Sequence, residues 1–383
     1  KDGGKLEGRL LALSIAVPQV TEIVKNFGGE GNKTFNALTD SVSQGVSMFT
    51  GVTSMFPGPS GKAVAGILGI GGAASSLAKS LQNQSQDMAK AVEQSKEKFT
   101  VLPKSKINIK NYILNAYQNY SPPPEFVALV GDVGGSYNIT TYYDGHGHNS
   151  YGNDCEGDHP FSQLQGNDLL PEVLIGRMSV RSSSELGTVV SKIIGYEKAA
   201  VLSSSPNYYE RASCAGDPST SGNSCAVTNE YVAELLVNYG MSEVELKTSG
   251  SSWSSWMENN LEEGVLYFNY RGYLGVSGFD NSDVDGANNG FKLPFATVLT
   301  CGTGSFAEDQ TTLSEKFFRA GSATNPKGGV AAIGTATWNT HTLFNNIVDM
   351  GIYHGIFVSE LSTAGGALAS GKLALYNAYP GDP

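Results

Sequence analysis

The chain has 383 residues and a formal net charge of −11, with 36 acidic and 25 basic residues. This balance, without any run of Lys or Arg, argues against nucleic acid and against an anionic membrane as the main partner. Charged residues make up only 16% of the chain and glycine numbers 47, a composition more typical of an exported protein than of a cytosolic one. We therefore expect an extracellular or cell-surface location.

Residues 1–99 form a first segment with helical periodicity over 10–27, 35–56 and 62–99, and with a Pro/Gly break at 57–61. A helical hairpin that packs on its own domain or on a partner accounts for this pattern. Its Gly, Ala and Ser faces also allow close helix approach, as in a self-assembling element. A third interpretation is an inhibitory pro-region that lies over a cleft. The apolar stretch 63–81 is interrupted by glycines, Ser75 and Lys79, so no transmembrane helix is expected.

From residue 100 to 383 helix and strand patterns alternate, which predicts an α/β domain with a mostly parallel sheet flanked by helices. The segment between 134 and 170 is expected to be a long polar loop. The expected strands are 126–130, 173–175, 210–215, 265–269, 295–300 and 329–334, and the expected helices are 107–120, 183–200, 230–239, 313–320, 343–361 and 366–376.

Cys301 is the most informative residue, because residues 293–304 (LPFATVLTCGTG) run from a buried strand pattern into a glycine-rich turn. Parallel sheets place their chemistry at the carboxyl ends of strands. The glycines after the thiol allow a tight turn that brings N–H groups close to a reacting atom. A buried small apolar residue is the alternative interpretation of Cys301.

Five ordered segments resemble the gingipain family of cysteine peptidases, whose catalytic domain has a caspase-like fold. The resemblance covers roughly residues 103–380 and rests on PPEFVALVGD (123–132), LPEVLIGR (170–177), VLYFNYRG (265–272), FATVLTCGTG (295–304) and GGVAAIGT (328–335). It implies that Cys301 stands at the position of the nucleophile. The backbone N–H groups of Cys301, of Gly302 and of the turn from Gly272 to Gly275 are the expected oxyanion donors.

The catalytic base is the point at which this chain departs from the family. The family pattern is Asn-Tyr-x-Gly-His-Gly, whereas residues 269–275 read NYRGYLG, with Tyr273 in place of the histidine. A phenol ordinarily has a pKa near 10 and is a poor proton shuttle at neutral pH, although it can donate a hydrogen bond. His341, after the strand 329–334, is the candidate substitute base. Otherwise it is a polar residue that lines the cleft.

The resemblance also bears on specificity. Family members that cut after Arg or Lys hold the basic side chain with a carboxylate near the helix at 230–239. Here Cys225 falls closest to that position, with Asp217 and Glu230 as neighbouring acids and Trp338 as a pocket wall. We therefore do not expect cleavage after Arg or Lys. Cys214 and Cys225 flank a polar loop, and either a local disulfide or two free thiols fits an exported protein.

The loop at 142–159 is rich in oxygen and imidazole ligands. Its carboxylates suit a structural Ca²⁺ ion, while His146 and His148 leave Zn²⁺ as an alternative and a solvated turn as another. No cofactor is required by the expected chemistry. The candidate calcium ligands are Asp144, Asp154, Glu156 and Asp158.

The sequence thus predicts a gingipain-like cysteine peptidase domain that acts on protein or peptide substrates through Cys301. The alternative is a catalytically inactive pseudopeptidase, in which the same cleft binds a partner or builds an extracellular assembly with residues 1–99. The two differ in whether a base lies within reach of the Cys301 thiol, since proton transfer needs direct contact or one bridging water.

Overall fold

The computed structural model describes residues 105–135, 138–143, 155–336, 338 and 340–380. The chain divides into two compact units, residues 1–103 and 104–383, and the described residues belong to the second. The predicted helical segment at 1–99, with its assembly and pro-region interpretations, lies outside the described residues. Among the described residues, the structure contains no helix long and apolar enough to cross a membrane.

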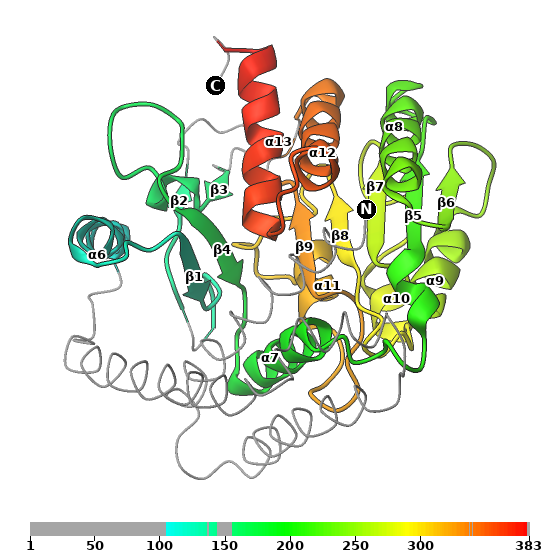
Figure 1. Ribbon diagram of the computed structural model, residues 1–383, viewed down its shortest axis with the longest axis horizontal. Coiled ribbons are helices and arrows are strands. Elements are labelled where there is room, and N and C mark those ends of the chain that lie inside the picture. Colours follow the sequence, from blue (N-terminus) through cyan, green and yellow to red (C-terminus); the bar gives the residue numbers. More distant parts are fainter. Residues whose placement is uncertain (1–104, 136–137, 144–154, 337, 339, 381–383) are drawn as a thin grey trace, which may run out of the picture. The chain divides into compact units, whose positions relative to one another are not determined.

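The main sheet has five strands in the order β6-β5-β7-β8-β9, and every neighbouring pair is parallel (Figure 1). Because all five strands run in one direction, their carboxyl ends meet at the same edge of the sheet. The strands are β5 (Arg211–Gly216), β6 (Glu243–Lys247), β7 (Tyr267–Arg271), β8 (Phe295–Val298) and β9 (Ala331–Gly334).

Helices cover both faces of this sheet (Figure 1). One face is covered by α8 (Ser224–Tyr239), α12 (Thr342–Phe357) and α13 (Ala364–Ala378), around a core that includes Leu236, Ile352 and Tyr353. The other face carries α9 (Trp253–Glu263), α10 (Asn281–Gly286) and α11 (Leu313–Arg319), around a core that includes Met257, Phe268 and Phe317. Strand residues therefore alternate between two buried faces, as expected for an interior parallel sheet.

A smaller parallel pair, β1 (Phe126–Val130) and β4 (Leu174–Met178), lies beside the main sheet with α6 (Lys106–Asn119) packed near it. The segment that connects β1 to β4 contains an antiparallel pair of two-residue strands, β2 (Tyr142–Tyr143) and β3 (Glu156–Gly157), and a short 3₁₀ helix, η1 (His159–Phe161). After β4 come α7 (Ser183–Glu197) and a second 3₁₀ helix, η2 (Pro206–Glu210).

A buried ionic cluster joins the smaller pair to the main sheet's helices. Asp132, which is fully buried after β1, accepts hydrogen bonds from Arg181 and from Arg319 of α11. Arg319 also pairs with Glu315 at 2.5 Å. Buried charges are tolerated only when they are paired and hydrogen-bonded in this way, so the cluster fixes the two parts of the domain against each other.

The predicted α/β class and parallel sheet are confirmed, and each predicted strand or helix from residue 107 onward has a counterpart in the structure. Outside the expected loop at 134–170, the elements missed are η2, β6, α9 and α10, and α8 begins at Ser224 rather than at residue 230. The stretch 134–170 was expected to be loop throughout, yet β2, β3 and η1 lie in it. β6 is an edge strand, and Glu243, Glu245 and Leu246 are exposed on it. Its sequence, EVELK, alternates charged with apolar residues, as is common in edge strands.

Candidate active site

Cys301 lies just beyond the carboxyl end of β8, at the edge where the parallel strands end. It forms an isolated parallel bridge with Leu274, which follows β7, and it is partly buried. Its Sγ lies 3.8 Å from the Oγ1 atom of Thr340, in the segment between β9 and α12. The thiol is thus held where the ends of three neighbouring strands converge.

Glycines fix the two turns at this edge. Gly302 has φ +72°, and a Cβ atom there would lie 2.5 Å from the Cζ2 atom of Trp338. Gly275 has φ +65°, and its carbonyl oxygen accepts a hydrogen bond of 3.0 Å from the hydroxyl of Thr300. Positive φ values and an indole packed on the backbone both require glycine, so these positions admit no side chain without strain.

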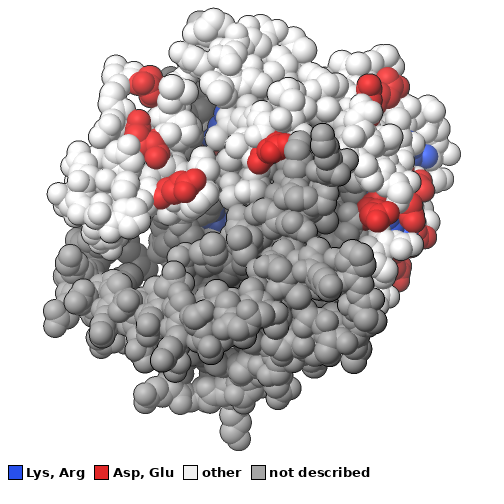
Figure 2. All heavy atoms as spheres, viewed as in Figure 1, with Lys and Arg blue, Asp and Glu red and all other residues white. Residues whose placement is uncertain are grey.

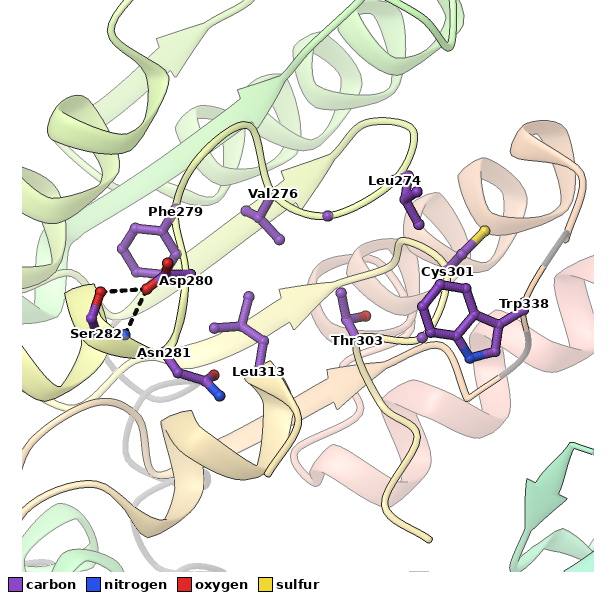
Figure 3. A pocket seen from close by; sticks show the side chains of 12 residues that line it. Leu274, Val276, Phe279, Asp280, Asn281, Ser282, Cys301, Thr303, Leu313 and Trp338 are labelled. Atoms are coloured by element: carbon purple, nitrogen blue, oxygen red, sulfur yellow. Dashed lines mark hydrogen bonds between the residues drawn. The ribbon is translucent and has the colours of Figure 1, made fainter. Parts of the chain in front are cut away.

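A cleft of about 690 Å³ opens beside the thiol. Its walls are mostly apolar, with Val276, Phe279 and Leu313 along its length and Trp338 beside Cys301. Figure 3 shows the sulfur of Cys301 pointing away from the end of the cleft formed by Asp280, Asn281 and Ser282. An apolar cleft with a few polar groups is the common form of a ligand-binding site.

Tyr273, which is predicted to stand at the position of the family's histidine, is 57% exposed and follows β7 in the same turn as Leu274. Gly272 before it is buried, and a Cβ atom there would clash with the Tyr270 hydroxyl. Gly272 and Gly275 therefore shape the turn beside Cys301, and the side chain predicted to replace the family's base is an exposed phenol.

His341 caps the amino terminus of α12. Its Nδ1 atom accepts a hydrogen bond of 3.2 Å from the backbone N–H of Leu343, and its exposed ring packs near Phe344. A neutral imidazole that accepts at Nδ1 carries its proton on Nε2. In this arrangement the ring has no free lone pair with which to take a proton from Cys301, so its role as base requires the cap to open. The assignment of His341 as base stays a prediction.

The residues predicted for the specificity pocket do not form an exposed acidic group. Cys225 is buried at the start of α8, and burial raises the pKa of its thiol. Burial of Asp217 acts to raise its pKa, but hydrogen bonds from Ser219 and Ser277 outweigh this and lower it. Glu230 is exposed on α8, and Trp338 lies against Cys301 in the cleft. Cys214 and Cys225 are separate thiols and form no disulfide here.

The predicted calcium ligands divide into two groups. Asp144 and Asp154 lie outside the described residues, as do His146 and His148. Asp158 pairs through both oxygens with Arg177, at 2.7 and 2.8 Å, and Glu156 accepts from the backbone N–H of Ala307. Within the described part of the chain no group of three or more His, Cys, Asp or Glu is placed to hold a metal ion. Calcium binding by this loop stays a prediction.

A buried polar network beneath the site was not anticipated from the sequence. Arg271, the last residue of β7, is fully buried and donates from Nε to Asn346 of α12 at 2.8 Å. Nearby, Asn269 donates to Asp349 at 2.9 Å and to Asn229 at 3.1 Å. Burial raises the pKa of Asp349 to about 7, even though Asn269 and Arg271 act to lower it. Perturbed titratable groups below a cleft are a frequent mark of a functional site.

Comparisons with known proteins identify the family to which the chain belongs. Residues 74–382 match the family model described as Peptidase family C25. Over 188 residues the chain is 28% identical to gingipain R2 and to gingipain R1, both of Porphyromonas gingivalis. That match covers 46% of this chain but only 25% of gingipain R2 and 19% of gingipain R1. The chain therefore corresponds to a fraction of the length of these relatives.

Solved structures show the same fold. The crystal structure of the Arg-specific cysteine proteinase gingipain R superimposes with a TM-score of 0.63 at 23% identity, over 73% of this chain and 64% of that chain. A complex of gingipain pro- and mature domains from P. gingivalis gives a TM-score of 0.61 at 22% identity, over 73% of this chain and 66% of that one.

A parallel α/β sheet with a thiol at the carboxyl end of a central strand is the framework of a caspase-like cysteine peptidase domain. The chain belongs to Peptidase family C25. The resemblance to the gingipains is confirmed, but its start was placed too late, because the family match begins at residue 74 instead of 103 and so includes part of the segment 1–99.

Proposed function

We propose that this chain hydrolyses peptide bonds through the thiolate of Cys301. The observation that carries the proposal is the position of Cys301 at the end of β8, bridged to the turn after β7 and among the residues that line an apolar cleft. Membership of a cysteine peptidase family supports the same function.

The chemistry follows from what a thiol can do at that place. The Cys301 thiolate adds to the carbonyl carbon of the substrate, and the oxyanion accepts hydrogen bonds from N–H groups at the strand ends, with Cys301, Gly302 and the turn 272–275 as the donors. The C–N bond then breaks and the amine leaves with a proton, which His341 or the Tyr273 hydroxyl supplies. Water attacks the thioester, which releases the acid and returns the thiol.

The substrate class follows from the pocket. The family's carboxylate for a basic side chain is replaced by the buried thiol of Cys225, and the Asp217 carboxylate is held by Ser219 and Ser277. Val276, Phe279 and Leu313 instead offer apolar surface along the cleft. The proposed substrates are therefore extended protein segments with apolar side chains rather than segments with Arg or Lys at the cleaved bond.

The setting proposed for this activity is outside the cell. The acidic composition supports it, and on the face in Figure 2 Asp and Glu side chains are scattered while Lys and Arg are sparse. Such a surface does not favour nucleic acid. Residues 1–99 remain proposed as a pro-region or an assembly element.

Digestion of a mixed peptide library, read by mass spectrometry, tests the proposal. We expect cleavage by the 383-residue chain, none by Cys301→Ala, and unchanged cleavage by Cys155→Ala, which removes a buried thiol elsewhere. Cleavage that survives Cys301→Ala would contradict the role of Cys301. Enrichment of Arg or Lys immediately before the cleaved bond would contradict the proposed substrate class.

A second candidate is a pseudopeptidase that binds peptides without cutting them. The exposed Tyr273 at the histidine position and the occupied Nδ1 atom of His341 favour it. In this case the library stays intact while peptides are retained by the immobilised chain. Retention that is lost when Trp338 is replaced by Ala would locate binding in the cleft beside Cys301.

A further inference from the structure

Ser277 holds a backbone conformation that serine rarely adopts. Its φ is +49°, in the left-handed region, where the Cβ atom of an L-residue lies too close to a carbonyl oxygen. The same stretch of chain already uses glycine at two left-handed positions, Gly275 with φ +65° and Gly278 with φ +90°. Glycine would also fit at position 277 without strain, so the serine side chain has a role that offsets the strain.

The Ser277 hydroxyl is the middle member of a chain of three side chains. Its Oγ atom donates to the Oδ2 atom of Asp217 and lies 2.7 Å from the hydroxyl of Tyr270, a buried residue of β7. A hydroxyl has one proton, and Ser277 uses it on the carboxylate, so the Tyr270 hydroxyl donates in the other hydrogen bond. The chain therefore runs from Tyr270 through Ser277 to Asp217.

Both ends of this chain are fixed to the main sheet. Tyr270 belongs to β7, and Asp217 directly follows the neighbouring strand β5. The backbone N–H of Asp217 donates to the carbonyl oxygen of Arg271 at 2.9 Å. Its Oδ1 atom accepts from the backbone N–H of Ser219 at 2.9 Å and from the hydroxyl of Ser219 at 2.5 Å. Ser277 is thus tied through its side chain to two adjacent strands.

The turn that ends at Ser277 contacts the strand of the proposed nucleophile. Leu274 forms the parallel bridge with Cys301, and the carbonyl oxygen of Gly275 accepts at 3.0 Å from the hydroxyl of the residue before Cys301. Residues 274–276 also line the cleft, and Figure 3 shows Leu274 and Val276 among its side chains. The conformation of this turn therefore decides the shape of the cleft next to the thiol.

The Tyr270 hydroxyl meets both ends of this turn. A Cβ atom on Gly272 would overlap that hydroxyl, and at the other end the hydroxyl donates to Ser277. A turn that is held at both ends keeps the N–H groups between them in one direction. Donors that are oriented before the reaction are what the oxyanion of a peptide substrate requires.

We propose that Ser277 is a positioning residue that fixes the turn 272–277, through Tyr270 and Asp217, in the conformation in which its N–H groups bind the oxyanion of the substrate. This role rests on the proposed function, because both concern the same reaction. It gives Asp217, predicted as an acid of the specificity pocket, to Ser277 and not to the substrate. Loss of the hydroxyl should weaken oxyanion binding and leave the reaction of Cys301 with small reagents unchanged.

Peptide aldehydes and iodoacetamide separate these two effects. The Cys301 sulfur adds to the aldehyde carbon and the thiol proton passes to the carbonyl oxygen, which gives a hemithioacetal whose oxygen lies where the oxyanion would form. Iodoacetamide forms an S–C bond and releases iodide, and no oxyanion arises. The probes are acetylated tripeptide aldehydes with Leu, Phe or Val next to the aldehyde. Their dissociation constants follow from the protection of Cys301 against iodoacetamide, read by peptide mapping.

Ser277→Gly removes the hydroxyl and also the strain, so this variant should fold with a stability close to that of the wild type. We expect it to weaken aldehyde binding about ten- to a hundredfold, with the alkylation rate in the absence of aldehyde within about twofold of the wild type. Tyr270→Phe should weaken binding similarly. The double variant should bind no more weakly than the weaker single variant, because the two hydroxyls act through one chain.

Ser252→Gly is the matched control. Ser252 is also strained, with φ +58°, but its side chain makes no cap hydrogen bond at the start of α9 and it does not line the cleft. Its replacement by glycine relieves the same kind of strain and should leave aldehyde binding unchanged.

The outcomes distinguish the two proposals. A wild-type Cys301 that none of the aldehydes protects contradicts the proposed function itself. Protection that is equally strong in the wild type and in folded Ser277→Gly overturns the role of Ser277 alone. That role is also overturned if the losses add in the double variant, or if the alkylation rate falls as much as aldehyde binding does, because the effect is then not confined to the oxyanion.

Discussion

Replacement of Asp349 by Asn should stabilise the protein, and most strongly at neutral to alkaline pH. Asp349 is fully buried in α12, and burial raises its pKa from 3.8 to about 7. The groups that face it are Asn269 and Arg271 of β7, Cys214 of β5, Cys225 of α8 and Tyr353 of its own helix. Only Arg271 among these is a cation, and its charge does not offset the rise in the pKa of Asp349 that burial causes.

The sign follows from proton linkage. Between an ordinary carboxyl pKa and about 7 the folded state binds the proton more tightly than the unfolded state, so the free energy of unfolding falls as the pH rises through that range. A rise of about 3 in pKa corresponds to about 4 kcal/mol. The destabilisation is complete above pH 7 and is absent below about pH 4.

The amide in Asp349→Asn has the same shape as the carboxyl group and no charge, so this variant avoids the destabilisation. The amide oxygen accepts the existing bond from Asn269, whose own buried Oδ1 atom lacks a partner among the described residues and can accept from the new amide. Urea unfolding followed by circular dichroism should show Asp349→Asn more stable by about 4 kcal/mol at pH 8 and by about 2 kcal/mol at pH 5. Asp285→Asn, at an exposed pair with Lys316, is the control and should change stability by less than about 1 kcal/mol at both values. An equal gain at both pH values, or a loss at pH 8, would show that burial does not destabilise the Asp349 carboxylate.

Two further substitutions probe the site and the domain. Gly302→Ala should lower stability by about 1–3 kcal/mol and change tryptophan fluorescence, because φ is +72° and the new Cβ meets Trp338 at 2.5 Å. Gly290→Ala is its control, with φ +58° and nothing within 4 Å, so it should show the backbone strain alone; equal effects would contradict the packing of Trp338 on Gly302. Asp132→Asn should cost about 3–5 kcal/mol at pH 7, because it removes the carboxylate that pairs with Arg181 and one of the two that pair with Arg319. Burial alone would raise the pKa of Asp132, but Arg181 and Arg319 lower it. The loss of stability in Asp132→Asn, measured by thermal unfolding, should therefore shrink as the pH falls below an ordinary carboxyl pKa. A loss of stability that does not change with pH would contradict the pairing.

Strand positions and the place of the thiol were accessible from the sequence, because they rest on local signals. Continuous apolar runs such as FATV at 295–298 mark strands buried on both faces, and the glycines after Cys301 mark a turn. In contrast, α9 begins after Ser252 with φ +58° and no side-chain cap, and its sequence is rich in Ser and Asn. Neither feature gives a helix signal.

The environment of the site was not accessible, because it depends on contacts between distant residues. An arginine at the end of a strand is expected to be exposed, yet Arg271 is buried by Asn346, which lies 75 residues further along the chain. His341 was considered as a base because of its position after a strand. Its role as a helix cap became visible only once α12 was known to begin at Thr342.

A covalent peptide probe tests most directly whether Cys301 is the nucleophile of a peptide-cleaving site. The folded chain is incubated at pH 7 with a set of apolar peptidyl acyloxymethyl ketones, and the rate and position of labelling are read by mass spectrometry. We expect a single adduct on Cys301 that forms much faster in the folded chain than in urea. Labelling of Cys301 no faster than in urea, or equal labelling of Cys155, Cys214 or Cys225, would contradict it.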